Sequence, residues 1–453
     1  MKQNNLFLLA FVVFIFACNS DDYDYISIQI KTQNDSTQVY QNSFIEIDVF
    51  SNDTNIPKTG VLTISNSSNA TISVMDNGTP ENPSDDKILY TPTSNFLGID
   101  NFAYTICSLG ENCATATVSV TVLPASPVVY DPVSLPYPKL SDYKFFEGEL
   151  KNLEPVSGVI PYDLNSGLFS DYAKKKRFLW IPNGSKATYN SDYTPLDFPI
   201  GTFLIKNFYY ENVLPTGNTK IIETRLMYFT ESGWEFAEYV WNTNQTEATF
   251  TVNGSFSTID WIDSGTTKSV NYRVPSRTEC FTCHNKFGTP IPIGPKPQNL
   301  NKDYNYPEGT TNQLEKWVEY GYLDSSYPEN IDTTVAWDDS LQPLDLRARS
   351  YFDINCAHCH SEESHCEYRP MRFAFEESEL ARNMGICVPP ETNMGSAYPL
   401  IINPGNPSGS VAIFRMSAVE EQYRMPILGR SLQHTEGILL ITEWINSLTD
   451  RCN

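Results

Sequence analysis

The pattern Cys-x-x-Cys-His occurs twice in this chain and constrains its fold and chemistry more than any other feature. The two copies consist of Cys280, Cys283 and His284, and of Cys356, Cys359 and His360. Two thiols three positions apart can each add across a vinyl group of one porphyrin, and the adjacent imidazole then reaches the iron. Chance placement of 10 Cys and 5 His in 453 residues would give roughly 0.002 such patterns. We therefore predict two covalent haem c groups, with the histidine of each motif bound to iron.

Three other chemistries use paired cysteines: a zinc site, a thioredoxin-like redox pair, and ordinary structural thiols. Each of them leaves the repeated histidine after the second cysteine unexplained. Haem attachment gives a role to all three residues of both motifs, so it is the interpretation that we carry forward.

The length and charge of the chain limit its organisation and its partners. At 453 residues the chain is too long for one ordinary domain, and about three domains are expected. Its 31 Lys and Arg against 54 Asp and Glu give a net charge of −23, which repels the phosphates of nucleic acids. This charge is compatible with a basic redox partner, which the sequence does not identify, and it is more often typical of a solvated acidic surface.

Residues 1–18 have the pattern of an export signal. One Lys precedes the apolar run Leu6–Ala17, which is too short to span a membrane. The run ends in Ile15-Phe16-Ala17-Cys18, which resembles the lipobox of bacterial lipoproteins, and the acidic stretch Asn19–Asp22 is similar to a signal that carries such lipoproteins to the cell surface. The resemblance implies acylation of Cys18 and an outer-membrane lipoprotein, cell-surface or periplasm-facing, held to the membrane by its lipid anchor. A cleaved secretory peptide with an incidental Cys is the alternative, and it also implies export.

Residues 24–123 are predicted to form an all-β, Ig-like sandwich. Apolar and polar residues alternate through Ala114–Val122, which is typical of a half-buried strand. The stretch Tyr90–Tyr104 contains Tyr-Thr-Pro and Phe-x-Gly-x-Asp-x-Phe-x-Tyr, and it resembles cadherin-like and Ig-like repeats of bacterial surface proteins. That resemblance implies a spacer or adhesion module. Cys107 and Cys113 flank a tight loop between two strands, and we expect an exported chain to join them as a disulfide.

The next two segments are a predicted Pro-rich linker, residues 124–140, and a β-rich domain, residues 141–275. The basic run Lys174–Arg177 is interpreted as a solvated turn. The clearest strands are Phe203–Tyr210, Ile221–Phe229, Trp234–Trp241 and Ala248–Val252.

The chain after residue 275 is predicted to be mostly α-helical and cytochrome c-like. Residues 276–340 form a first haem segment, with a helix at Asn312–Leu323, and residues 341–453 form a cytochrome c-like domain with the second haem. Helices are expected at Leu344–Asn355, which delivers Cys356, and at Glu436–Leu448. The predicted fold class is therefore multidomain: an Ig-like sandwich, a β-rich middle domain and a mostly α C-terminal region.

Two resemblances concern the chain after the sandwich. Motifs in Tyr162–Phe178, Pro199–Lys206 and Glu223–Leu226 resemble a family of uncharacterised bacterial dihaem c-type cytochrome lipoproteins, and the likeness runs from about Tyr143 to the C-terminus. A less extensive likeness is to cytochrome P460, and it consists of Pro-x-Gly-Thr-x-x-x-Lys followed by Gly-Trp and Cys-x-x-Cys-His. This likeness implies a β-sheet haem protein with an open iron face. Lys206 ends the first of these motifs, and we assign it no haem cross-link.

The second axial ligand of each iron decides between electron transfer and chemistry. For the second motif the candidate is Met425, in a Met-Pro segment that is similar to the ligand loop of cytochrome c domains, and Met416 is the alternative. No Met or His lies between His284 and Cys356. The second axial position of the first iron is therefore vacant or weakly occupied, or its ligand is brought in by folding from a distant part of the chain. The distant candidates are Met227, His365, His434, Met371, Met384 and Met394, and we interpret His434 as an ordinary surface residue.

Three cysteines remain after the lipid, the haem groups and the first disulfide are assigned. We expect Cys366 to pair with Cys387, which would close the loop after the second motif and contribute about 3 kcal/mol. Cys452 is then the odd thiol.

Three functions are consistent with these patterns. The first is an exported dihaem cytochrome that transfers electrons. The second is a haem oxidoreductase, in which an open first haem acts on a small oxidant or nitrogenous substrate and the second haem is the relay. The third is a surface binding or adhesion protein. The sequence leaves open whether the chain is an enzyme.

Overall fold

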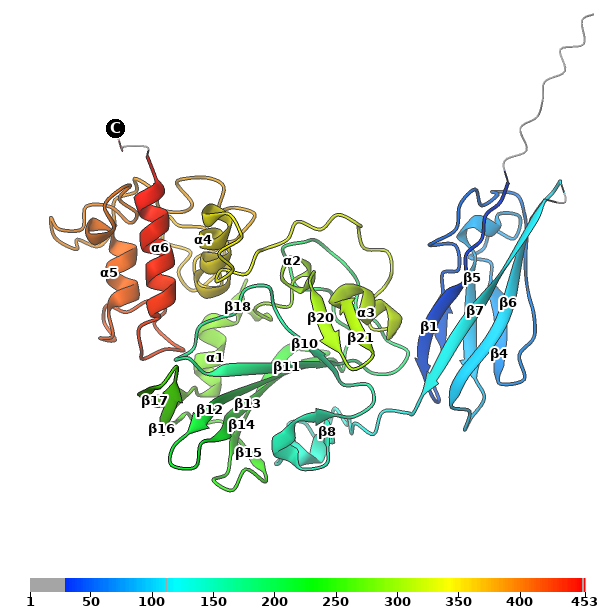
Figure 1. Ribbon diagram of the computed structural model, residues 1–453, viewed down its shortest axis with the longest axis horizontal. Helices are drawn as coiled ribbons and strands as arrows, with labels where there is room; N and C mark the ends of the chain where they lie inside the picture. The colour runs from blue at the N-terminus through cyan, green and yellow to red at the C-terminus, as the bar shows by residue number, and fades with distance from the viewer. Residues whose placement is uncertain (1–28, 111, 450–451, 453) are drawn as a thin grey trace, which may run out of the picture.

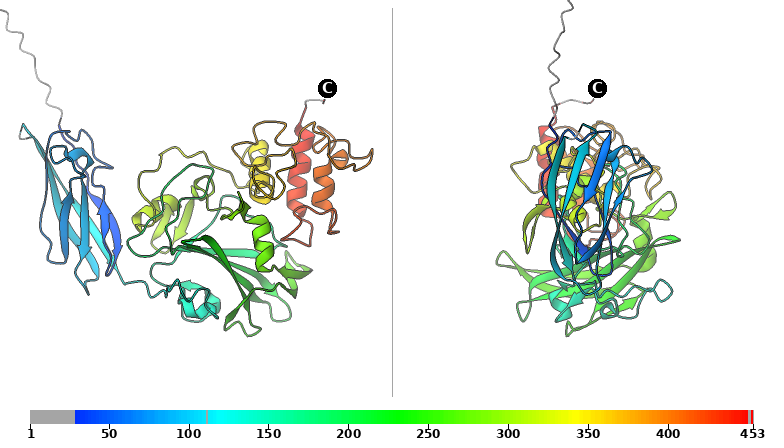
Figure 2. Two further views of the ribbon diagram at one scale, coloured as in Figure 1. Left: turned by 180° about the vertical axis from the view of Figure 1, so that it is seen from behind. Right: turned by 90° about the vertical axis from the view of Figure 1, so that its right-hand side faces the viewer.

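The computed structural model describes residues 29–110, 112–449 and 452, which form three successive parts (Figure 1). A β-sandwich comes first, a large twisted sheet follows, and helices and loops end the chain. The sandwich and the terminal helices lie at opposite ends, with the sheet between them (Figure 2, left). The predicted signal and Cys18 lie outside the described residues. Within the described part, no helix has the length and apolar character that are needed to cross a bilayer.

The N-terminal sandwich consists of two sheets whose inner faces share one core. The predicted alternation is confirmed, since Val118, Val120 and Val122 are buried and the residues between them are not. The disulfide between Cys107 and Cys113 joins two strands at their hairpin, as predicted. The first sheet has the order β1 (Asp35–Tyr40), β7 (Cys113–Leu123), β6 (Gly98–Ser108) and β3 (Gly60–Ile64), and the second has β2 (Ile45–Ile47), β5 (Lys87–Pro92) and β4 (Ala70–Met75).

The segment that joins the sandwich to the central sheet has little regular structure before a short 3-10 turn, η2 (Leu140–Tyr143). Its second half is not free in solvent, because Tyr137 and Leu140 are buried against the sheet and Tyr239 donates a 2.7 Å hydrogen bond to the carbonyl of Tyr137. A short ribbon, β8 (Phe146–Glu147) and β9 (Glu154–Pro155), and a 3-10 turn, η3 (Leu150–Asn152), follow.

The central sheet has eight strands, and neighbouring strands are paired antiparallel. The predicted strands of the middle region are confirmed as β12 to β15. The solvated turn predicted for Lys174–Arg177 is wrong, because these residues begin β11 and continue into the buried Phe178, Leu179 and Trp180. The strands are β10 (Ile160–Tyr162), β11 (Lys174–Trp180), β12 (Phe203–Val213), β13 (Asn218–Thr230), β14 (Gly233–Trp241), β15 (Ala248–Thr251), β16 (Ser255–Asp263) and β17 (Thr266–Val274).

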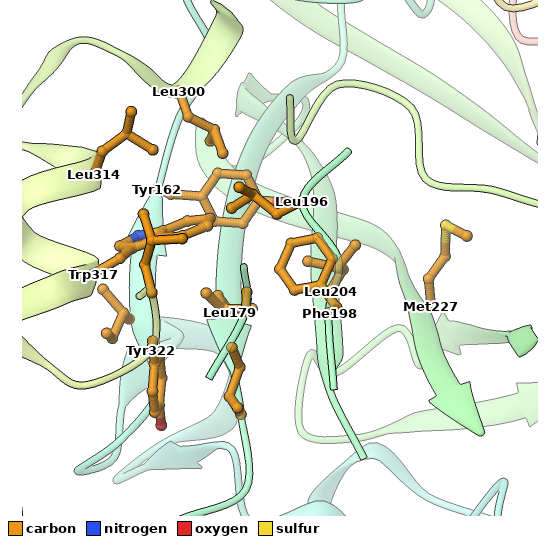
Figure 3. Packing of buried hydrophobic residues seen from close by; sticks show 14 of the residues in the cluster. Tyr162, Leu179, Leu196, Phe198, Leu204, Met227, Leu300, Leu314, Trp317 and Tyr322 are labelled. Carbon is orange, nitrogen blue, oxygen red and sulfur yellow. The ribbon is translucent and has the colours of Figure 1, made fainter. Parts of the chain in front are cut away.

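The two faces of the central sheet are covered by different parts of the chain. One face packs on the aromatic residues around η2, including Tyr143 and Phe145. The other face packs on the chain that follows the sheet: Leu314 and Trp317 meet the strand residues Tyr162, Leu179 and Leu204 (Figure 3). Figure 3 also shows Met227 on the same face, away from Trp317.

The segment after the sheet contains short helices and two ribbons. The helix predicted at Asn312–Leu323 is shorter than expected: α3 spans Gln313–Glu319, and the chain turns at Gly321, whose φ is 72°. The elements are α1 (Arg277–Cys283), β18 (Asn285–Lys286), β19 (Thr289–Pro290), α2 (Pro297–Leu300), β20 (Asp303–Tyr306), β21 (Gly309–Asn312) and α3.

The C-terminal part is only partly helical. Helix α4 (Leu344–Phe352) passes into a π-helical turn (Asp353–Ala357), and α5 (Val411–Ser417) and α6 (Thr435–Ser447) follow. The first and last predicted helices are therefore present. The expected mostly α character is not, because residues 358–410 are turns and loops with one short 3-10 turn, interrupted by prolines and glycines that break helices.

Candidate functional site

Helix α1 presents the first Cys-x-x-Cys-His motif. Its start is fixed by a capping box, in which the backbone N–H of Ser276 donates to Glu279 over 2.9 Å, and Arg273 forms an ion pair with the same carboxylate. Cys280 and Cys283 are three residues apart on this helix and therefore lie on one side of it. The helix ends at Cys283, and His284 follows directly as its C-cap residue.

The imidazole of His284 is oriented by the backbone. Its Nδ1 lies 2.9 Å from the carbonyl oxygen of Ile291, so Nδ1 donates and the lone pair of Nε2 is left for a metal. The ring packs edge-on against Phe236 of β14, with ring centres 5.4 Å apart. Burial lowers the pKa of His284 to about 4, and the neutral form required of a ligand is therefore favoured.

A pocket of about 1170 Å³, its open mouth included, lies between the first motif and the central sheet. Cys280, Cys283 and His284 form one wall, and strands β12, β13 and β14 form the opposite wall. The strand wall is apolar at Leu204, Met227 and Phe236 and charged at Lys206, Arg225 and Glu238.

The second motif begins in the π-helical turn that ends α4. Backbone N–H groups of Cys359 and His360 donate to the carbonyl of Cys356 over 3.1 and 3.0 Å, which folds the motif into a compact turn. His360 is 9% exposed and packs edge-on against Phe373, and its buried Nδ1 has no hydrogen-bond partner among the described residues. Burial lowers the pKa of His360 to about 4.

A cleft of about 1010 Å³, its mouth included, opens beside His360. The predicted ligand Met425 and the alternative Met416 both line it. The Met425 segment is held in place on both sides: its N–H donates to the carbonyl of Arg415 over 3.0 Å, and the guanidinium of Arg430 donates to its carbonyl over 2.8 Å. Met371 and Met394, which were candidates for the first iron, line this second cleft instead.

The structure brings the two motifs into contact. The donor atoms of Cys283, His358 and Cys359 all lie within 4.8 Å of one another, and His358 lines both the pocket and the cleft. A 3.0 Å hydrogen bond from the N–H of Phe287 to the carbonyl of Glu363 joins the two segments through the backbone. Pro426 also lines both spaces, so the pocket and the cleft share a wall.

His358 lies between the two cysteines of the second motif, and no pattern in the sequence indicates its contact with Cys283. With two thiols and an imidazole in such proximity, the cluster also matches three of the four ligands that zinc prefers. The hydrogen bond between the two thiols lowers the pKa of Cys283 and raises that of Cys359.

Among the distant candidates for the first iron, Met227 is the residue that lines the pocket beside His284. His365 is exposed, and Met384 is buried in the core of the C-terminal part. The expectation that His434 is a surface residue is wrong: it is 7% exposed, its Nδ1 lies 3.0 Å from the hydroxyl of Tyr351, and its ring stacks on Phe169 with centres 4.1 Å apart.

The second predicted disulfide is also wrong. Cys387 is bonded to Cys452, and Cys366 is a buried free thiol that lines the second cleft. The N–H of Cys366 donates to the carbonyl of Cys359 over 2.9 Å, which keeps Cys366 at the motif. Cys387 instead donates to the carbonyl of Ile402, in a segment that packs near the end of α6, where the chain leads on to Cys452.

Comparison with known proteins concerns the N-terminal sandwich. The family model described as "Bacterial Ig domain" matches residues 29–121. These residues form a bacterial Ig domain. No curated protein matches the chain.

Several solved structures share a distant likeness with the chain. The D00-D0 domain of intimin is 9% identical over 54% of this chain and 97% of its own, with a TM-score of 0.18. Protocadherin gamma B7 cadherin domains 1–4 are 10% identical over 55% and 76%, with a TM-score of 0.17. The teleost fish polymeric Ig receptor ectodomain is 8% identical over 53% and 96%, also with a TM-score of 0.17. Likenesses of this size establish no common function.

The Ig domain contacts the part of the chain that covers the central sheet. Tyr40, in β1, packs with Tyr320 and Tyr322, with ring centres 6.2 and 6.4 Å away. The side chain of Gln38 donates a 2.6 Å hydrogen bond to Glu319 at the end of α3. The end of β1 therefore docks the Ig domain on this part of the chain. In the sequence, β1 is far from both motifs.

Proposed function

We propose that this chain is an exported electron-transfer protein that carries two covalent haem c groups. One observation supports the proposal above all others: two complete Cys-x-x-Cys-His motifs meet at Cys283 and Cys359, and each opens on a space of its own. A zinc or disulfide-exchange role has no use for two separate pockets, each beside the histidine of one motif.

The residues present fit two haem groups. In the first pocket, Cys280 and Cys283 would form the thioether links, and His284 has its Nε2 free for iron because Ile291 holds Nδ1. In the second cleft, Cys356 and Cys359 would form the links, and the unpartnered imidazole of His360 would bind iron. Bound haem iron cycles between two oxidation states and so supplies one-electron transfer.

Met425 would complete the second site. It lines the same cleft as His360, and Arg430 and Arg415 fix its backbone. A thioether ligand favours the reduced iron and raises the reduction potential. Met416 lines the cleft as well and is the alternative ligand.

The contact between the motifs supports a role in electron transfer. Because Cys283 and Cys359 are adjacent, the protein would hold two redox groups side by side without intervening chain. Such a pair can accept an electron at one end and deliver it at the other. The net charge of −23 suits a basic protein as redox partner.

Export and a lipid anchor at Cys18 belong to the same proposal. The apolar run before Cys18, the bacterial Ig domain and two disulfides support a place outside the cytoplasm. Acylation at Cys18 would hold the protein to the outer membrane.

The test is haem content. The full chain is produced in a bacterial host with the machinery for haem c attachment, and haem is measured as the pyridine haemochrome alongside zinc analysis. We expect two haem groups per chain and no stoichiometric zinc. The double variants Cys280→Ala/Cys283→Ala and Cys356→Ala/Cys359→Ala should each retain one haem. Zinc without haem would overturn the proposal.

A haem oxidoreductase is the second candidate, because charged side chains face the first pocket. Lys206, Arg225 and Glu238 line the pocket opposite His284, where charged groups could orient a small polar substrate. Under this alternative the first iron is open to a small oxidant or nitrogenous substrate, and the second haem site is the relay. A high-spin component in the optical or electron paramagnetic resonance spectrum of the wild-type protein would support it.

A further inference from the structure

A row of charged residues crosses the wall of the first pocket. Arg177 of β11 lies opposite Lys206 of β12, Lys206 lies opposite Arg225 of β13, and Arg225 lies opposite Glu238 of β14. Residues in register on neighbouring strands point to the same face, with Cβ atoms about 5 Å apart. Three cationic side chains therefore stand next to one another on a largely buried part of the sheet.

Like charges in directly opposed positions destabilise a sheet unless something compensates them. Two of the three cations have compensation within the chain. Arg177 donates to Asp163 over 2.5 Å, and Arg225 donates to Glu223 over 2.5 Å and lies 3.5 Å from Glu238.

Lys206 has no such partner. Among the described residues its Nζ forms no ion pair and no hydrogen bond, and it lies 5.1 Å from the centre of the Phe208 ring. Burial and the neighbouring guanidinium groups of Arg177 and Arg225 lower the pKa of Lys206. The pocket therefore disfavours the protonated amine, and an anion bound beside Lys206 would stabilise that form.

The other charged groups of the pocket do not supply Lys206 with a counter-ion. Arg273 and Glu279 neutralise each other at the start of α1. Glu238 is 4% exposed with its Oε1 buried and unpartnered, and burial together with Glu223 raises its pKa, which favours the neutral acid. A neutral Glu238, which shares a hydrogen bond with Glu223, adds no negative charge that would repel an anion from Lys206.

We propose that the first pocket contains an anion-binding subsite, in which Lys206 and Arg225 bind a carboxylate or small oxyanion and Glu238 contacts it. The anion has two possible sources, and Lys206 recognises the same chemistry in both. One source is a propionate of the haem in this pocket, and in this case the inference rests on the proposed function. The other source is a diffusible anion of substrate size.

The diffusible source is tested by isothermal titration calorimetry of the full chain with sodium nitrite and with sodium acetate at constant ionic strength. The variants are Lys206→Met and, as a matched control, Lys176→Met. Lys176 lies on the same strand pair but is exposed and on the opposite face, in register with Asn207. If the anion is diffusible, we expect binding to wild type, at least tenfold weaker binding to Lys206→Met, and unchanged binding to Lys176→Met.

The propionate source is tested by resonance Raman spectroscopy of the same proteins. If the subsite holds a propionate, wild type does not bind added anions, and the propionate bending band of one haem shifts in Lys206→Met but not in Lys176→Met. The subsite is overturned if neither effect occurs, or if both variants behave alike. Haem content is measured separately and the calorimetry does not require haem, so failure of the subsite and failure of the dihaem proposal give different results. Circular dichroism confirms that both variants are folded.

Discussion

Cys283 and Cys359 belong to different motifs, 76 positions apart in the sequence, and their sulfur atoms lie within 4.8 Å of each other. The contact is made by two separate structures: α1, which leaves the central sheet, and the π-helical turn that ends α4. The central sheet and the C-terminal helices are therefore not independent around these residues. They form one site with two spaces, and the histidines of the two motifs face different ones.

The first prediction concerns Met425 at the second site. Met425→Ala should lower the reduction potential of one haem and remove its near-infrared Met-ligand band, because the loss of the thioether destabilises the reduced iron. The other haem should keep its potential. Spectroelectrochemical titration of the full chain measures both.

Met416→Ala is the matched control, since Met416 lines the same cleft. It should leave both potentials in place. If Met416→Ala removes the band and Met425→Ala does not, the ligand assignment is reversed.

The second prediction concerns Met227 at the first site. Met227 is 8% exposed and lines the pocket opposite His284, so we expect its thioether to bind the iron of a haem held there. Met227→Leu keeps the volume and should cost less than about 1.5 kcal/mol of folding free energy, yet it should convert one haem to a high-spin form. Magnetic circular dichroism detects the change.

Met384→Leu is the control, because Met384 is buried in the C-terminal core away from both spaces. A wild-type protein that already contains one high-spin haem, unaffected by Met227→Leu, would contradict the assignment and favour the open first site of the oxidoreductase alternative.

What the sequence predicted well is local. Both motifs are contiguous, so their chemistry needs no knowledge of the fold. Strands such as β13 were predictable because β-branched and aromatic residues are concentrated in Ile221–Phe229, which is typical of a strand buried on both faces. The Ig domain was predictable from a different pattern, the alternation of apolar and polar residues in Ala114–Val122.

What the sequence missed depends on contacts between distant segments. Four adjacent basic residues, Lys174–Arg177, have no apolar period and so suggested a turn, yet strand geometry turns Lys175 and Arg177 inward and exposes the other two. His358 has no local signal, because its neighbour Cys283 is set by the packing of α1 against the second motif. The predicted partner of Cys387 was wrong for a similar reason, since spacing alone cannot show that the end of α6 is near.

The third prediction concerns the disulfide between Cys387 and Cys452. The two residues are 65 positions apart, so the bond should contribute about 4 kcal/mol by restricting the unfolded chain. Cys452→Ala should lower the free energy of unfolding of the C-terminal part by about that amount in urea.

Peptide mapping without reduction identifies the bond directly and should recover Cys387 linked to Cys452. Cys366→Ala is the control, because Cys366 is a free thiol, and the linked peptide should persist in it. A linked peptide containing Cys366 and Cys387 would show that the pairing is different.

The fourth prediction concerns the pH dependence that His434 imposes. Burial lowers the pKa of His434 to about 4, against an unfolded value of 6.5. The folded protein therefore binds this proton less readily than the unfolded chain does. The contribution of neutral His434 to the free energy of unfolding is present above pH 6.5 and is lost as the pH falls toward 4. The loss between pH 7 and pH 5 is about 2 kcal/mol.

His434→Gln isolates this effect from other acid-sensitive groups. The glutamine can still accept from the hydroxyl of Tyr351, whose oxygen lies 3.0 Å from His434 Nδ1, but it does not titrate. The variant should be less stable than wild type at pH 8, because the stack on Phe169 is lost, and the difference should shrink by pH 5. Urea unfolding at several pH values gives, for each protein, the slope of the unfolding free energy against pH. Equal slopes for wild type and variant would mean that the imidazole is not held neutral between α4 and the loop before β11.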